Sequence, residues 1–123
     1  MATPSAKLKL AQSHLERVLA AWDPPDWSDL SLYGFYALEA AVEAAALHFA
    51  VPARKAHWAR VDAAEELHEG HGLPDVAGLL RDLNDSRKSV AYGDVQAPDL
   101  DAEHVATAIE LYVDAVAALV RGE

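Results

Sequence analysis

LLRDLNDSRKSVAYGD, residues 79–94, is the stretch that decides how this chain folds. Apolar side chains recur in it at spacings of three and four, which predicts an amphipathic helix, and Arg87 stands in the apolar stripe where a leucine is expected. A guanidinium stays protonated and is costly to desolvate, so a buried Arg87 needs a carboxylate, a helix C-terminus or a ligand phosphate opposite it. The alternative is an arginine at the edge of the stripe, with a packed stem and a head that reaches water. The stripe consists of Val76, Leu80, Leu83, Arg87 and Val90.

The net charge limits what the surface as a whole can bind. The chain carries 20 acidic and 10 basic side chains, and its net charge of -10 repels phosphate backbones and excludes a general nucleic-acid coat. Any contact with a nucleotide or RNA is therefore expected to be local. Five basic residues fall in two segments that would form one basic patch if the fold brings them together: Arg54, Lys55, Arg60, Arg87 and Lys88.

Length and cysteine content indicate the domain count and the compartment. A chain of 123 residues predicts one domain over residues 1–123, with its core at about 5–121. The absence of cysteine excludes a disulfide framework and thiolate chemistry, which fits a reducing compartment. His14, Glu16 and Arg17 interrupt the N-terminal segment where a signal peptide needs an unbroken apolar run. We therefore expect a cytoplasmic protein.

Periodicity and helix-end signals predict helices and no strand. Ser5 and Asp101 are the expected N-caps of the first and last helices, and Trp27 is expected to anchor the loop before the second. Pro74 fits the first turn of the fourth helix, and Gly93 fits its left-handed end. The predicted fold class is all-α, an up-and-down antiparallel bundle of four to five helices. The expected helices cover residues 5–22, from 28 or 31 to 50, 54–69, 74–93 and 102–121.

The second predicted helix is the most apolar segment of the chain. A membrane span of this length is disfavoured because Glu39 and Glu43 would lie near the bilayer centre, so we expect no membrane and a central helix packed on more than one side. The two glutamates are four residues apart and share one helix face. Either this face is simply the solvated one, or one of the two glutamates meets Arg87.

Two histidines near the end of the third predicted helix raise the question of a metal site. His68 and His71, with Glu65, would share one side if the helix continued, but Gly70 falls between them and no fourth ligand has a suitable spacing. A solvated helix end is the preferred interpretation. We therefore predict no metal and no cofactor.

Two segments together resemble the HEPN superfamily of small helical domains. They are LYGFYALEAA, residues 32–41, in the second predicted helix, and RKSVAYGD, residues 87–94, in the fourth, and the resemblance spans most of residues 5–120. Many such domains use an arginine and, after four intervening positions, a histidine at a dimer interface to cut RNA without a metal. Others carry arginine, two variable residues, then alanine, aspartate and tyrosine. This chain is closer to the second kind: Arg87 matches the arginine, Tyr92 falls at the histidine or terminal tyrosine, and Ala91 replaces the aspartate.

The departures from the cleaving motif bear on activity. RNA cleavage without a metal needs a base for the 2′-hydroxyl proton and an acid for the leaving oxygen, and Tyr92, with an unperturbed pKa of about 10, is a poor base. Lys88 stands where active members often place a polar or histidine side chain. The chain is therefore expected to bind a nucleotide or a partner rather than to cut RNA. The predicted binding residues are Arg87, Lys88, Tyr92, Glu39 and Glu43, with Arg87 and Tyr92 catalytic only in an active enzyme.

The resemblance also implies partners. It implies a homodimer, and a minimal nucleotidyltransferase paired with the chain in a toxin and antitoxin system. Some such partners modify a tyrosine two residues after the histidine, where this chain has Asp94. Two alternatives to the binding function remain: a metal-independent endoribonuclease toxin, and a helical bundle that only binds another protein.

Overall fold

The computed structural model describes residues 2–53, 56–91 and 98–122, with only the backbone described at positions 90 and 91. These residues form five α-helices and no β-strand, which confirms the all-α fold class. The helices are α1 (Pro4–Ala21), α2 (Trp27–Phe49), α3 (His57–His71), α4 (Ala77–Ala91) and α5 (Ala102–Arg121).

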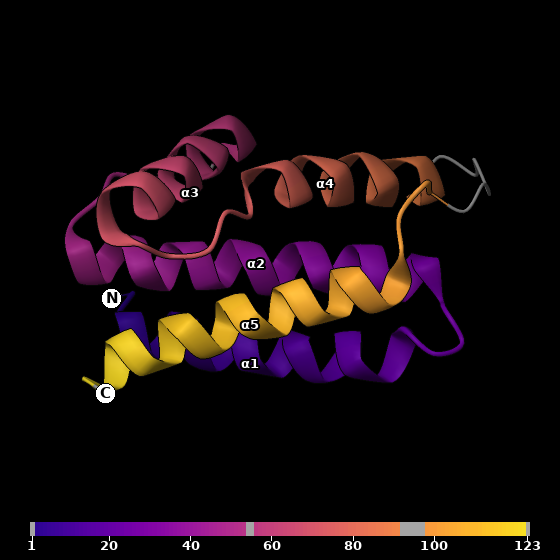
Figure 1. The fold of residues 1–123 in the computed structure, drawn as a ribbon, viewed down its shortest axis with the longest axis horizontal. Coiled ribbons are helices and arrows are strands. Elements are labelled where there is room, and N and C mark those ends of the chain that lie inside the picture. The colour runs from indigo at the N-terminus through magenta and orange to yellow at the C-terminus, as the bar shows by residue number, and fades with distance from the viewer. Residues whose placement is uncertain (1, 54–55, 92–97, 123) are drawn as a thin grey trace.

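Helix α2 is the centre of the bundle, because it packs against each of the other four helices. In Figure 1, α1 and α5 lie on one side of α2, while α3 and α4 lie on the other. Helix α4 covers the N-terminal half of α2, and α3 covers its C-terminal half. The polar face of α2 carries Glu39 and Glu43, which pair with Arg60 of α3 and Lys7 of α1.

The direction of α3 differs from the predicted up-and-down order. The first residue of α3, His57, packs against Phe35, and its last residue, His71, stacks on Phe49, so residue numbers rise together along α2 and α3. Helix α3 therefore runs in the same direction as α2, and the antiparallel prediction is wrong for this pair. Helix α1 is antiparallel to α2, as predicted (Figure 1). Because α3 breaks the alternation, α4 runs antiparallel to α2 as well, whereas an up-and-down bundle would make these two helices parallel. The consequence for the site is that the start of α3 lies beside the middle of α2.

The N-terminal caps explain where three helices begin. The Thr3 side chain accepts the first capping hydrogen bond of α1, so this helix begins before the predicted cap, Ser5. Asp26 caps α2 in the same way, and Trp27, predicted in the loop, is therefore the first residue of that helix. Asp101 caps α5 with its side chain, which confirms the prediction.

Helices α3 and α4 meet at a connection that is longer than predicted. Gly72 ends α3 in the left-handed conformation, with φ of 75°. Helix α4 begins at Ala77 rather than at Pro74, and the Asp75 side chain accepts a hydrogen bond of 3.3 Å from the backbone N–H of Ala77. The predicted cap at Gly93 lies outside the described residues.

The apolar surface of α2 is covered by the other helices. By length and composition α2 could cross a membrane, but 67% of its most apolar window is buried inside the bundle, which is the pattern of a core helix. At Gly34 the neighbours come especially close: a Cβ there would lie 3.0 Å from Cδ1 of Ile109 and 3.3 Å from Cδ1 of Leu83. Glycine thus lets α4 and α5 approach α2 together, one turn of α4 before Arg87.

Candidate functional site

Arg87 lies at the edge of the core rather than inside it. Its side chain is half-buried, and its Cζ atom lies 4.4 Å from the centroid of the buried Phe35 ring. Its Nε donates a hydrogen bond of 3.1 Å to Oδ1 of Asn84, one turn earlier in α4. A guanidinium stacked on an aromatic face keeps its charge and its terminal N–H donors while its stem remains packed. The stripe-edge alternative from the sequence therefore describes Arg87 correctly.

Two buried serines fix the position of α4 beside this arginine. The hydroxyl oxygens of Ser31 in α2 and Ser86 in α4 are 2.6 Å apart, and both residues are buried. One hydroxyl donates to the other, so each buried oxygen has a hydrogen-bond partner, which offsets much of the cost of burying it. The pair lies one residue before Arg87 and one turn before Phe35, so it holds the two surfaces that stack.

His57 is a site residue that the sequence analysis missed. Its ring centroid lies 5.8 Å from that of Phe35, and its Nδ1 is buried with no hydrogen-bond partner among the described residues. Burial lowers the pKa of His57, and the positive charges of Lys88 and Arg87 lower it further, so the imidazole is neutral near pH 7. Nothing in the spacing of the sequence connects a histidine at the start of α3 with the end of α4.

The ion pairs on α2 differ from those expected. Glu39 and Glu43 were expected to include the partner of Arg87, but both bind Arg60 of α3. Nη1 of Arg60 lies 2.8 Å from Glu39, its Nη2 pairs with Glu43, and Nζ of Lys7 lies 2.7 Å from the other oxygen of Glu43. Within the part of the chain that the structure describes, no ion pair joins Arg87 to a carboxylate, so the predicted pairing is wrong.

The pKa of Glu39 is raised even though its carboxylate is paired with Arg60. Burial raises the pKa of Glu39, the charge of Arg60 opposes this rise, and the neighbouring carboxylate of Glu43 adds to it. Arg87 contributes a smaller lowering effect from a longer distance. Among the described residues the network pairs Glu39 and Glu43 with Arg60 and Lys7, and no ion pair joins either carboxylate to Arg87.

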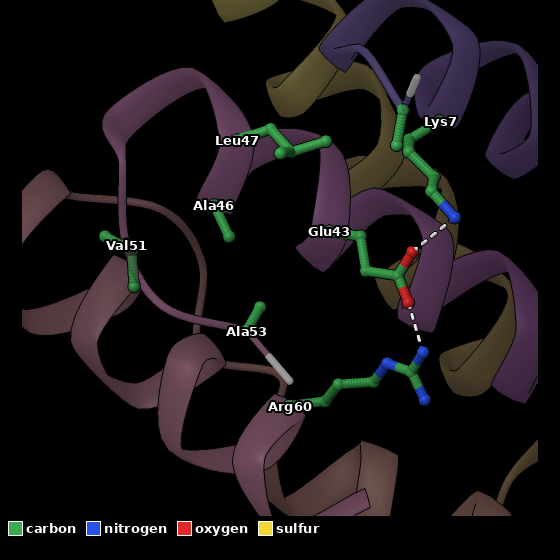
Figure 2. A pocket seen from close by; sticks show the side chains of 8 residues that line it. Lys7, Glu43, Ala46, Leu47, Val51, Ala53 and Arg60 are labelled. Atoms are coloured by element: carbon green, nitrogen blue, oxygen red, sulfur yellow. Dashed lines mark hydrogen bonds and ion pairs between the residues drawn. The ribbon is translucent and has the colours of Figure 1, made fainter. Parts of the chain in front are cut away.

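A pocket of about 220 Å³ lies beside the network and is lined by its residues Lys7, Glu43 and Arg60 (Figure 2). In Figure 2 the carboxylate of Glu43 lies between the side chains of Lys7 and Arg60 at one end of the pocket, and small apolar side chains line the rest. Both oxygens of Glu43 already accept from a cation. The pocket wall is therefore polar at one end, where the carboxylate of Glu43 is paired with Lys7 and Arg60. The apolar wall consists of Ala46, Leu47, Val51 and Ala53.

The two histidines considered for a metal have other contacts. His68 donates from Nδ1 to the carbonyl oxygen of Leu73 at 2.7 Å, and the His71 ring stacks on Phe49 with centroids 4.0 Å apart. Among the described residues no three histidine or acidic side chains are grouped to hold a metal ion. The first contact closes the turn after α3, and the second packs the end of α3 on the end of α2.

The structure thus gathers part of the predicted site. Arg87 and Lys88 lie together at the end of α4, with the Lys88 side chain exposed, whereas Glu39 and Glu43 bind Arg60. Tyr92, and the Arg54 and Lys55 of the predicted basic patch, lie outside the described residues.

A fixed guanidinium, a neutral imidazole and an aromatic ring can bind a phosphate and hydrogen-bond a neighbouring hydroxyl. In comparisons with protein-family models, with curated proteins and with solved structures, nothing matches this chain. The small all-helical fold is compatible with a HEPN-like domain. The resemblance to that superfamily rests on the sequence of residues 32–41 and 87–94.

Proposed function

We propose that this chain is a HEPN-like helical protein that binds a nucleotide at Arg87 and performs no chemistry of its own. The observation that carries the proposal is the state of the guanidinium: it rests on Phe35, its Nε is held by Asn84, and no described carboxylate pairs with it. The terminal nitrogens of such a guanidinium match the oxygens of a phosphate. Lys88, exposed beside it, adds a second positive charge.

The same proposal includes the setting that the resemblance implies. The protein would act in the cytoplasm as a homodimer, together with a minimal nucleotidyltransferase. A bundle that only binds another protein predicts an Arg87 sealed against a carboxylate, and the described residues provide no such partner. Nucleotide binding therefore ranks above the pure interaction function.

Replacing Arg87 with alanine is expected to weaken binding of adenosine 5′-monophosphate and of inorganic phosphate by about 10- to 100-fold. Charged hydrogen bonds are worth about 1.5–3 kcal/mol each, which corresponds to this range. Isothermal titration calorimetry measures both ligands on the full chain. Arg87→Lys should recover only part of the affinity, because an ammonium keeps the charge but loses the stacked, two-pronged geometry.

The matched control is Arg81→Ala. Arg81 lies on the same helix and its removal changes the net charge equally, but its side chain is exposed and pairs with Glu65 at 3.0 Å. This variant should bind both ligands like the wild-type protein. If Arg81→Ala weakens binding as much as Arg87→Ala does, the effect is one of general charge and the proposed site is wrong.

His57 favours a second candidate, metal-independent RNA cleavage. A neutral imidazole beside Arg87 could take the proton of a 2′-hydroxyl, whose oxygen then attacks the adjacent phosphate and releases the 5′-oxygen of the next nucleotide. Arg87 would stabilise the negative charge that develops on the phosphate. Tyr92, the predicted acid that would protonate the leaving oxygen, lies outside the described residues.

For this candidate, expression of the chain should slow cell growth, and His57→Ala and Arg87→Ala should each restore it. The purified protein should cut single-stranded RNA in the presence of EDTA, and both variants should lose this activity. Arg81→Ala, which alters no residue of the site, should remain active. Cleavage that survives His57→Ala would rule out His57 as the base.

A further inference from the structure

A second group of aromatic rings lies between α1 and α2. The His14 ring of α1 contacts Tyr33 and Tyr36 of α2, with centroid distances of 6.0 Å and 5.4 Å. The guanidinium of Arg17 lies 5.5 Å from the centroid of Tyr33. Tyr36 is 37% exposed, a large fraction for a ring that is packed on one side by a histidine. We call His14, Tyr33 and Tyr36 the α1–α2 ring cluster.

The α1–α2 ring cluster is continuous with the Arg87 site. The ring centroids of Tyr36 and Phe35 are 6.0 Å apart, and Arg87 lies 4.4 Å above the Phe35 ring. The guanidinium and the Tyr36 ring are therefore at most about 10 Å apart. A mononucleotide carries its phosphate and its base at opposite ends of one ribose, so it can reach from one group to the other.

The charges near Arg87 and the α1–α2 ring cluster favour an anion. The carboxylates of Glu39 and Glu43, which follow Tyr36 in α2, are paired with Arg60 and Lys7. Arg17 contacts the Tyr33 ring and Arg87 contacts the Phe35 ring, and Arg17 and Lys88, the residue after Arg87, are both exposed. A protein with a net charge of -10 thus presents a local region where cations and aromatic rings alternate, which is the composition that binds phosphates and stacks bases.

From these contacts we infer that Tyr36 stacks the base of a purine mononucleotide whose phosphate is bound by Arg87. This inference rests on the proposed nucleotide-binding function. It identifies the residue that binds the base, the part of the ligand that Arg87 does not contact. A purine offers a ring more stacking area than a pyrimidine does. His14 packs behind Tyr36 and holds its ring. Burial lowers the pKa of His14, which favours the neutral imidazole beside the Tyr36 ring.

The test compares two ligands, one with a base and one without, so that the contribution of the base to binding can be measured separately from that of the phosphate. Calorimetric titration of the full chain with adenosine 5′-monophosphate and with inorganic phosphate should show tighter binding of the nucleotide. Tyr36→Ala should weaken nucleotide binding about tenfold or more, the usual loss for one stacked base, and should leave phosphate binding unchanged. Tyr36→Phe keeps the ring and should bind both ligands like the wild-type protein.

The matched control is Leu47→Ala. Leu47 is an exposed apolar residue of the same helix, 45% exposed, and it lines the pocket at the far end of α2. Its removal should change neither affinity. The inference is overturned if Tyr36→Ala leaves the ratio of the two affinities unchanged, while the proposed function survives if Arg87→Ala still weakens both. If Arg87→Ala leaves phosphate binding unchanged, the proposed function fails and this inference fails with it.

Discussion

Replacing Arg60 with methionine is expected to lower the free energy of unfolding by about 3 kcal/mol. The Arg60 side chain is only 13% exposed, and its two ion pairs hold the carboxylates of Glu39 and Glu43, which are 19% and 13% exposed. Removing one partner of a buried ion pair costs about 3 to 5 kcal/mol because the remaining charge stays desolvated. The lower figure applies because Lys7 still neutralises Glu43. Urea unfolding of the purified chain at pH 7 measures the loss.

The cost of Arg60→Met should shrink as the pH falls. Burial raises the pKa of Glu39 in the folded state, and loss of the Arg60 charge raises it further. A group with a raised folded pKa stabilises the protein below its unfolded pKa, and this contribution is lost as the pH rises through the folded pKa. The free energy of unfolding of Arg60→Met therefore falls furthest below that of the wild-type protein near neutral pH. Unfolding at about pH 5, close to the ordinary range of a glutamate, should give a smaller difference from the wild-type protein.

Two further variants separate the ion-pair network from a general loss of charge. Arg81→Met removes an exposed cation, 55% exposed and paired with Glu65, and should cost less than about 1 kcal/mol. Adding Glu39→Gln and Glu43→Gln to Arg60→Met removes the buried charges and should restore much of the lost stability. Equal losses for Arg60→Met and Arg81→Met would show that the network does not stabilise the bundle.

The sequence predicted helix type well and helix direction poorly. All five helices were expected, because apolar residues at spacings of three and four leave little choice of secondary structure. Their starts were less certain since Thr3 and Ser5, or Asp26 and Ser28, are equally good caps. The direction of α3 depends on where the connection after α2 takes the chain, and no periodicity contains that information.

The sequence predicted the site residue whose signal lies within a single helix, and it missed the residues that other helices bring to the site. Arg87 was found because it interrupts an apolar stripe, a signal contained within α4 itself. Its stacking partner Phe35 was hidden in a run of apolar residues, and His57 reaches the site only because α3 runs parallel to α2. The predicted pairing with Glu39 or Glu43 was wrong for the same reason, since the parallel course of α3 brings Arg60 to both carboxylates.

Tyr112→Phe is expected to raise the free energy of unfolding by about 1 kcal/mol. Tyr112 lies in α5, its side chain is fully buried, and its hydroxyl has no hydrogen-bond partner among the described residues. An unsatisfied buried hydroxyl costs about 1 to 3 kcal/mol, and phenylalanine removes it while filling nearly the same volume. Tyr112→Ala should instead cost about 3 to 5 kcal/mol, because it leaves a cavity in the core.

A pH series identifies the hydroxyl as the cause. Burial raises the pKa of Tyr112 well above its ordinary value, so the unfolded chain ionises at a pH of about 10 while the folded chain does not. The stability of the wild-type protein therefore falls as the pH rises above 10, and Tyr112→Phe lacks this contribution. The advantage of the phenylalanine variant should be larger in urea unfolding at pH 10.5 than at pH 7. Tyr33→Phe, at a half-buried tyrosine that contacts Arg17 and His14, should not raise the free energy of unfolding at pH 7. A Tyr112→Phe variant less stable than the wild-type protein would mean that the hydroxyl has a partner in solution, most simply a buried water.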